Sequence, residues 1–212
     1  DISQLMVGFC TALNRHDEAV KYGLQSLDIR RTTAGENSQK VASSLSALSL
    51  SYLRSGDIEK AEDAIGESEK IYEKLGIEEP SFFQNKASIA FEKKDYASAQ
   101  KLFSKALELS ENQSGNASTV ISVLKSLSVC AQRQNNTDEA SSYIEKAVSV
   151  ASSAYGKEHP AMASVLNEKG LFEHSCGQYA KAMDTFADAL GIYDKAYGER
   201  SQPSHDVLLS MY

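Results

Sequence analysis

Histidine and cysteine are the side chains whose spacing would first reveal a metal site or a nucleophile. The four histidines lie too far apart to form the i, i+4 pair that binds zinc from one helix face: His16, His159, His174 and His205. The three cysteines are scattered as well, without metal-ligand spacing: Cys10, Cys130 and Cys176. We therefore expect no metal site and no cofactor. We expect the cysteines to be buried free thiols, which favours a reducing compartment and a cytoplasmic location.

Motifs of catalysis and phosphate binding are also missing from the sequence. It contains no Gly-x-Gly-x-x-Gly, no P-loop and no Gly-x-Ser-x-Gly. Clusters of glutamate and lysine, such as residues 67–70, fit solvated helix faces better than an active site. Carboxylate pairs can be assembled from distant residues, so an enzyme stays an alternative, but we expect no catalytic activity.

Charge and hydropathy narrow the class of partner. Lys and Arg number 22 against 29 Asp and Glu, a net charge of −7, which gives no attraction to nucleic acid. No apolar run reaches the ~18 residues that cross a bilayer, so we expect no membrane insertion. The first residue is not methionine, and the sequence stops inside an apolar pattern. We expect a fragment of a longer protein.

An alanine recurs along the whole chain and organises the sequence into repeats. These anchor alanines are 42, 38, 41 and 42 residues apart: Ala19, Ala61, Ala99, Ala140 and Ala182. Small residues stand twelve positions before four of them: Ser49, Ala87, Ser128 and Gly170. Apolar residues follow each anchor at spacing near 3.6, the period of a buried helix face. A tight turn precedes the anchor, and the small residue twelve positions earlier lets two helices approach closely.

Each repeat is therefore predicted to be a helical hairpin, with a first helix A and a second helix B that carries the anchor alanine. The expected fold is all-α: a single solenoid domain over residues 1–212, with five full units and the start of a sixth. The units cover approximately residues 1–35, 37–76, 79–113, 117–156, 159–198 and 203–212. One hairpin cannot bury its apolar face alone, so neighbouring hairpins must stack into a superhelix. Both ends would then expose apolar surface, and we expect end-to-end self-association.

The fifth unit carries the marks of a known repeat. It has Gly170, then Gly177-Gln178-Tyr179, then Ala182, Phe186 and Ala189. This pattern resembles the tetratricopeptide repeat, which implies a right-handed superhelix whose concave groove binds peptides or proteins. The longer period and residues 155–160, Tyr-Gly-Lys-Glu-His-Pro, resemble the kinesin light chain-like branch of that family. Kinesin light chains bind cargo-adaptor peptides in the groove, so the resemblance implies a peptide or protein partner.

The resemblance places a set of A-helix residues on the concave side. The candidate groove residues are Arg54, Asn85, Phe91, Lys125, Gln132, Arg133, Asn167, Leu171 and His174. A column of serines is expected on the same side: Ser43, Ser81, Ser122 and Ser164. Lys125 and Arg133 would form a basic spot for an acidic peptide in an otherwise acidic protein.

Three hypotheses follow for the function. The first is a peptide-binding adaptor that holds a partner segment in the groove. The second is a structural spacer or oligomerisation arm that uses its convex face or its ends. In the third, the repeats sense a ligand for an enzyme domain outside this segment.

Overall fold

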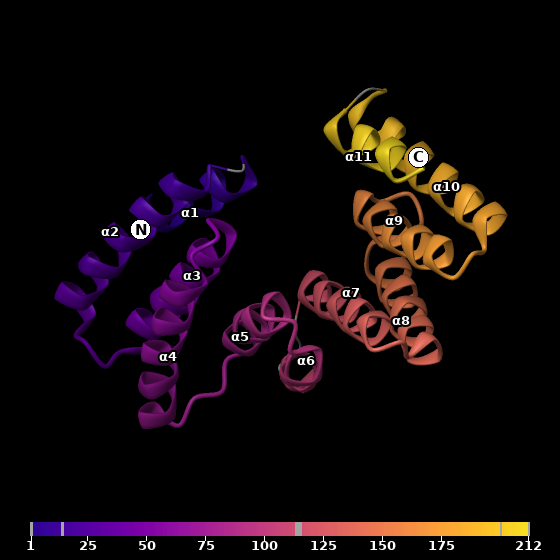
Figure 1. Ribbon diagram of the computed structural model, residues 1–212. Helices are drawn as coiled ribbons and strands as arrows, with labels where there is room; N and C mark the ends of the chain where they lie inside the picture. The colour runs from indigo at the N-terminus through magenta and orange to yellow at the C-terminus, as the bar shows by residue number, and fades with distance from the viewer. Residues whose placement is uncertain (1, 14, 113–115, 200, 212) are drawn as a thin grey trace. The chain divides into compact units, whose positions relative to one another are not determined.

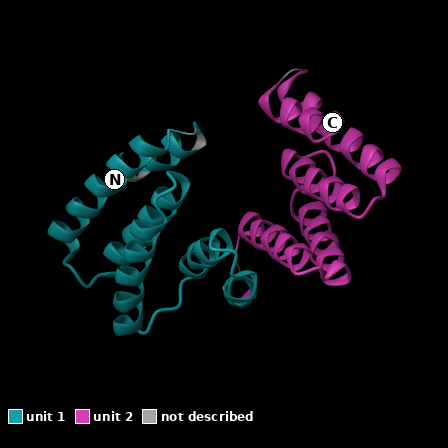
Figure 2. Ribbon diagram, viewed as in Figure 1, with its two compact units in different colours: residues 1–109 teal, residues 110–212 magenta. Residues whose placement is uncertain are grey.

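The computed structural model describes residues 2–13, 15–112, 116–199 and 201–211. The described residues form eleven α-helices and no strand, which confirms the all-α prediction. The chain divides into two compact units, residues 1–109 and 110–212 (Figure 2). The predicted boundaries at residues 1, 113 and 212 lie outside the described residues.

Unit 1 contains three helical hairpins (Figure 1). Helices α1 and α2, α3 and α4, and α5 and α6 follow one another as A and B helices. Their bounds are α1 Ile2–Ala12, α2 His16–Ala34, α3 Gln39–Arg54, α4 Ile58–Leu75, α5 Pro80–Glu92 and α6 Tyr96–Asn112.

Unit 2 contains two hairpins and one further helix. Helices α7 and α8 form its first hairpin, α9 and α10 its second, and α11 packs on both α9 and α10. Their bounds are α7 Ala117–Arg133, α8 Thr137–Tyr155, α9 Pro160–Ser175, α10 Tyr179–Tyr197 and α11 Gln202–Ser210.

The turn between the A and B helices needs one residue in the left-handed region. Gly56 and Gly177 have φ of 86° and 74° at this position, and Lys94 and Asn135 take the same place in two further hairpins, with φ of 64° and 61°. Glycine adopts this conformation without steric cost, whereas a side chain strains it. Five positions before the four anchor alanines from Ala61 onward, the turn therefore lies where the sequence predicts it, and position 14 of the first hairpin lies outside the described residues.

Helices A and B cross at the predicted small residues. All five anchor alanines are buried, and so are the small residues twelve positions earlier: Ser49, Ala87, Ser128 and Gly170. Ser128 donates from its hydroxyl to the carbonyl of Ala140, at 2.9 Å, so this crossing joins a small A-helix residue directly to an anchor. The hairpin packing thus follows the repeat pattern of the sequence.

The prediction for the cysteines holds for two of the three. Cys10 and Cys130 are buried free thiols, but Cys176 is exposed. Cys176 is the C-terminal capping residue of α9, at the turn into α10. A residue in a turn is not enclosed by neighbouring helices, so its thiol stays exposed. Among the described residues, no helix is long and apolar enough to cross a membrane. No group of three His, Cys, Asp or Glu residues in that part of the chain could hold a metal ion.

Candidate functional site

The nine candidate groove residues fall in both units. Unit 1 holds Arg54 on α3, with Asn85 and Phe91 on the neighbouring A helix α5. Unit 2 holds the other six on the neighbouring A helices α7 and α9: Lys125, Gln132, Arg133, Asn167, Leu171 and His174. We call these two surfaces the A-helix faces of unit 1 and unit 2.

Asn85 joins two A helices in unit 1. Its Nδ2 donates to the carbonyl oxygen of Ser46 at 2.9 Å and lies 3.0 Å from the Ser46 hydroxyl. Ser46 is buried on α3, so these bonds hold α5 against α3. A half-buried amide with two internal bonds contributes to stability, by about 0.5–1.5 kcal/mol per bond in general.

Lys125 is tied to the neighbouring helix in unit 2. Its Nζ donates to the Ser164 hydroxyl at 2.9 Å and lies 3.5 Å from Glu168 Oε1 on α9. The lysine charge is therefore partly neutralised inside the A-helix face. Arg133, the last residue of α7, is exposed.

The column of serines takes part in internal hydrogen bonds. The hydroxyls of Ser43 and Tyr72 are 2.9 Å apart, and Ser164 bonds the equivalent Tyr193 in the same way. Burial raises the pKa of both tyrosine hydroxyls, and the serine bonds partly oppose that rise. Two of the four serines thus help to fix an A helix on its own B helix, Ser43 for α3 on α4 and Ser164 for α9 on α10.

An aromatic contact recurs at the hairpin turn. The rings of Phe91 and Tyr96 meet edge to face in unit 1, with centroids 5.2 Å apart. His174 and Tyr179 repeat this contact in unit 2 at 5.0 Å. The unit 2 pair is open to solvent, because His174 is exposed and Tyr179 is 62% exposed. An exposed pair of flat rings offers contact area at low entropic cost.

Leu171 and Asn167 add an apolar and a polar element beside this pair. Leu171 is 41% exposed on α9, whereas Leu50 and Val129 at the equivalent position of α3 and α7 are half-buried. The Oδ1 atom of Asn167 is buried without a hydrogen-bond partner. The A-helix face of unit 2 therefore combines an exposed apolar side chain, two rings and an exposed cation, and the unpaired acceptor of Asn167 is buried.

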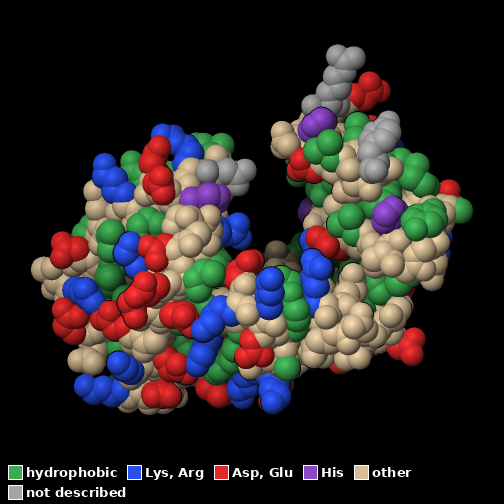
Figure 3. Space-filling model, viewed as in Figure 1, with side chains coloured by type: hydrophobic (Ala, Val, Ile, Leu, Met, Phe, Trp, Pro, Cys, Tyr) green, Lys and Arg blue, Asp and Glu red, His purple; other side chains and the backbone are tan. Residues whose placement is uncertain are grey.

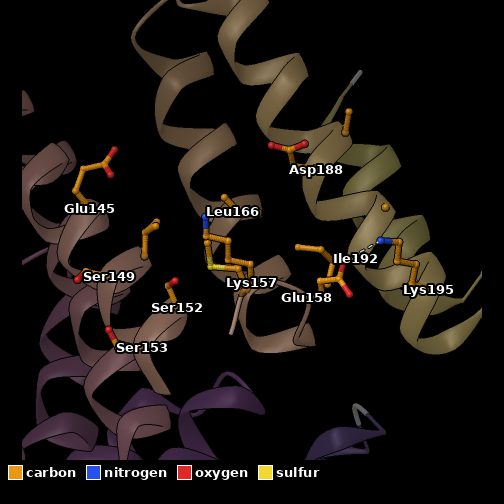
Figure 4. A pocket seen from close by; sticks show the side chains of 14 residues that line it. Glu145, Ser149, Ser152, Ser153, Lys157, Glu158, Leu166, Asp188, Ile192 and Lys195 are labelled. Atoms are coloured by element: carbon orange, nitrogen blue, oxygen red, sulfur yellow. Dashed lines mark hydrogen bonds and ion pairs between the residues drawn. The ribbon is translucent and has the colours of Figure 1, made fainter. Parts of the chain in front are cut away.

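A second surface, which the sequence analysis did not predict, lies between the B helices. In unit 2 a groove of about 830 Å³ runs between α8 and α10 over α9. Figure 4 shows Ser149, Ser152 and Ser153 on the α8 side and Asp188 and Ile192 on the α10 side. Its rim carries two ion pairs, Lys195 with Glu158 at 3.1 Å and Lys169 with Glu145 at 2.7 Å.

Unit 1 has a smaller groove in the equivalent place. About 320 Å³ lies between α4 and α6 over α5. Ion pairs of Lys86 with Glu69 and of Lys93 with Glu62 bridge from the floor to the α4 wall. In the view of Figure 3, acidic and basic side chains are interspersed over this unit. These grooves arise from helix stacking, so no motif in the sequence marks them.

Comparison with known proteins assigns the family. The tetratricopeptide repeat family matches residues 3–74, 81–153 and 119–195, which together span most of the chain. The chain belongs to the tetratricopeptide repeat family, as its residues indicated. A search of curated proteins found no match.

Solved structures share the fold at low sequence identity. BtubC (BKLC) from P. vanneervenii has a TM-score of 0.74 at 17% identity, over 92% of this chain and 81% of that one. Kinesin light chain-like repeats from Podosopora anserina give 0.70 at 16%, over 94% and 96%. A Rap protein complexed with competence and sporulation factor gives 0.81 at 12%, over 97% of this chain and 56% of that one. These likenesses establish a tetratricopeptide solenoid fold.

Proposed function

We propose that this chain is a non-catalytic scaffold that binds a peptide or protein segment on the A-helix face of unit 2. The observation that carries the proposal is the exposure of Leu171 beside the open His174 and Tyr179 rings. Peptide recognition commonly combines such apolar contacts with polar groups that bond the peptide backbone. Gln132, half-buried on α7, supplies such a polar group beside the exposed residues of α9.

The charge of this face defines the kind of segment it suits. Arg133 is exposed, while Lys125 shares its charge with Glu168. An acidic group on the partner would meet Arg133 at the end of α7, and an apolar side chain would meet Leu171. The preferred partner segment carries both an apolar side chain and a carboxylate.

Two further features support the proposal. The Rap structure with a similar fold was solved in complex with competence and sporulation factor, so a fold of this kind accommodates a bound partner. Buried free thiols at Cys10 and Cys130 suit a reducing compartment, and we propose that the protein acts in the cytoplasm.

Peptide selection tests the proposal although the partner is unidentified. Peptides selected from a random display library on the wild-type protein are measured against two leucine variants. Leu171→Ser removes an apolar contact from the A-helix face, whereas Leu24→Ser removes a similarly exposed leucine from α2.

We expect Leu171→Ser to weaken the selected peptides about tenfold or more, because burying a leucine is worth roughly 1.5–3 kcal/mol. Leu24→Ser should leave their affinity unchanged. Equal affinities for both variants would place the peptides elsewhere and refute the proposal.

A further inference from the structure

Glu173 on α9 is a buried carboxylate, with a side chain that is only 2% exposed. Its Oε2 atom accepts a hydrogen bond from the Thr185 hydroxyl of α10 at 2.7 Å. Its Oε1 atom has no hydrogen-bond partner within the described residues, but it lies 3.0 Å from the Nζ atom of Lys181, also on α10. A buried carboxylate has lost its hydration, so the charge of Lys181 is needed to offset what the Thr185 bond offsets only in part.

The other hairpins close the same turn without a charged side chain. Nine positions before each anchor alanine, the backbone carbonyl accepts from the amide five residues later, at 2.8–2.9 Å in all five hairpins. The residues at this position are Cys10, Tyr52, Ala90, Ala131 and Glu173. Thr185 stands where the other repeats have Tyr22, Ala64, Leu102 and Tyr143. The turn therefore does not require the carboxylate, and the fifth hairpin carries a polar pair that the hairpin architecture does not need.

Lys181 is exposed although its partner is not. Its side chain is 60% exposed, in the first turn of α10. Four other lysines of unit 2 pair with carboxylates that are at least 31% exposed: Lys125, Lys146, Lys169 and Lys195. Water solvates those carboxylates when the lysine charge is lost, but it does not reach Glu173. Of these five pairs, only that of Lys181 links a charge in solvent to a carboxylate in the core.

We infer that Lys181 is a modification site that controls the A-helix face of unit 2, through acetylation of its side-chain amine. Acetylation removes the positive charge and leaves Glu173 buried with its Oε1 atom uncompensated. Removing one partner of a buried ion pair is strongly destabilising, so the turn between α9 and α10 opens locally. That turn holds the contact between the rings of His174 and Tyr179. The effect on binding rests on the proposed function, whereas the effect on the turn does not.

The modification needs an acetyl donor of the thioester class. The unprotonated amine of Lys181 attacks the thioester carbonyl, and the new N–C amide bond forms as the C–S bond breaks. The amine proton passes to the departing thiolate, so the products are an acetylated lysine and a free thiol. The exposure of Lys181 gives the donor access to its Nζ atom.

The test uses the full chain with acetyl-lysine incorporated in place of Lys181. Hydrogen exchange, measured by mass spectrometry, should be about tenfold or more faster in residues 173–186 than in the wild type. Peptides selected on the wild-type protein from a random display library should bind the acetylated protein severalfold more weakly.

Three controls isolate the buried charge. Lys181→Arg keeps the positive charge and should match the wild type in both measurements. The same acetylation at Lys195, whose partner Glu158 is 77% exposed, should change neither. Glu173→Gln removes the buried charge, so acetylation of Lys181 should have no further effect in that variant. Glu173→Ala serves the same purpose if Glu173→Gln does not fold, because alanine occupies this position in α5 and α7.

Three outcomes would overturn the inference. The first is unchanged exchange in the acetylated protein, and the second is the same acceleration in the Glu173→Gln background. The third is faster exchange with undiminished peptide binding. Failure of the proposed function is recognised separately, by selected peptides that bind unmodified Leu171→Ser as tightly as the wild type. Control of the A-helix face by Lys181 would then fail with it, whatever the exchange rates are.

Discussion

A β-carbon added to Gly170 would lie 2.5 Å from Cε1 of Phe186. Gly170 is on α9 and Phe186 on α10, and the phenylalanine is completely buried. The two helices of this hairpin can approach as they do because position 170 has no side chain.

Gly170→Ala should destabilise the protein by about 1–3 kcal/mol, because a buried ring has no room to shift. Gly23→Ala is the matched control: its β-carbon would meet the flexible end of Leu48 at 2.9 Å, so a smaller loss is expected. Urea denaturation of both variants measures the difference. Equal stability of the two variants would contradict this prediction, because it would mean that the ring of Phe186 can move aside at little energetic cost.

Lys94→Gly should stabilise the protein by up to about 1 kcal/mol. Lys94 holds a left-handed φ of 64°, which costs a side-chain-bearing residue more than glycine. The reverse change, Gly56→Ala, should lose about 1 kcal/mol, because Gly56 has φ of 86° and open space around its β-position. Thermal melting of the two variants measures both changes: the melting temperature should rise in Lys94→Gly and fall in Gly56→Ala. A loss of stability in Lys94→Gly would mean that the lysine side chain contributes more than its backbone strain costs.

Cysteine labelling should distinguish the three thiols. At pH 8 a thiol reagent should modify Cys176 rapidly, because it is exposed, and leave Cys10 and Cys130 unmodified until the protein unfolds. Burial raises the pKa of the Cys130 thiol from 9.0 to about 11. The folded state therefore holds this proton more tightly than the unfolded state. Its contribution to stability is full below pH 9 and is lost as the pH rises toward 11.

Mass spectrometry of the labelled peptides, with and without urea, identifies which thiols react. Rapid modification of Cys130 in the native protein would contradict its burial. A stability that does not fall between pH 9 and 11 would contradict the raised pKa.

The fold could be predicted from the repeat pattern because the residues that define each hairpin lie close together in the sequence. Each anchor alanine, each small residue twelve positions earlier and each turn residue acts within one hairpin, so spacing alone places them. Gly170 and Gly177 illustrate this, since the first meets Phe186 and the second adopts the left-handed turn.

The roles of the face residues could not be derived in the same way. Asn85 binds Ser46, and Lys125 reaches Ser164 and Glu168, each through a partner 39 or more residues away. Such contacts depend on how neighbouring A helices pack. The spacing of the anchor alanines does not specify that packing. The grooves between B helices also follow from stacking, and Cys176 is exposed because of its place at a turn.

Lys125 and Arg133, the two residues of the basic spot, differ in their surroundings. A glutamate at position 125 would face Glu168, so a Lys125→Glu variant would mix like-charge repulsion into any binding result. Arg133 is exposed, and its reversal is expected to change stability little. Lys157→Glu offers a matched reversal in unit 2, because Lys157 lines the groove between α8 and α10.

The most direct measurement of peptide recognition by the A-helix face is the affinity of a selected acidic peptide for Arg133→Glu, at low and at high salt. We predict that Arg133→Glu weakens the peptide severalfold at low salt and that its remaining affinity depends less on salt than the wild type's. Lys157→Glu should bind with the affinity and salt dependence of the wild type. Unchanged binding in Arg133→Glu together with weakened binding in Lys157→Glu would contradict the account and place the partner in the groove between the B helices.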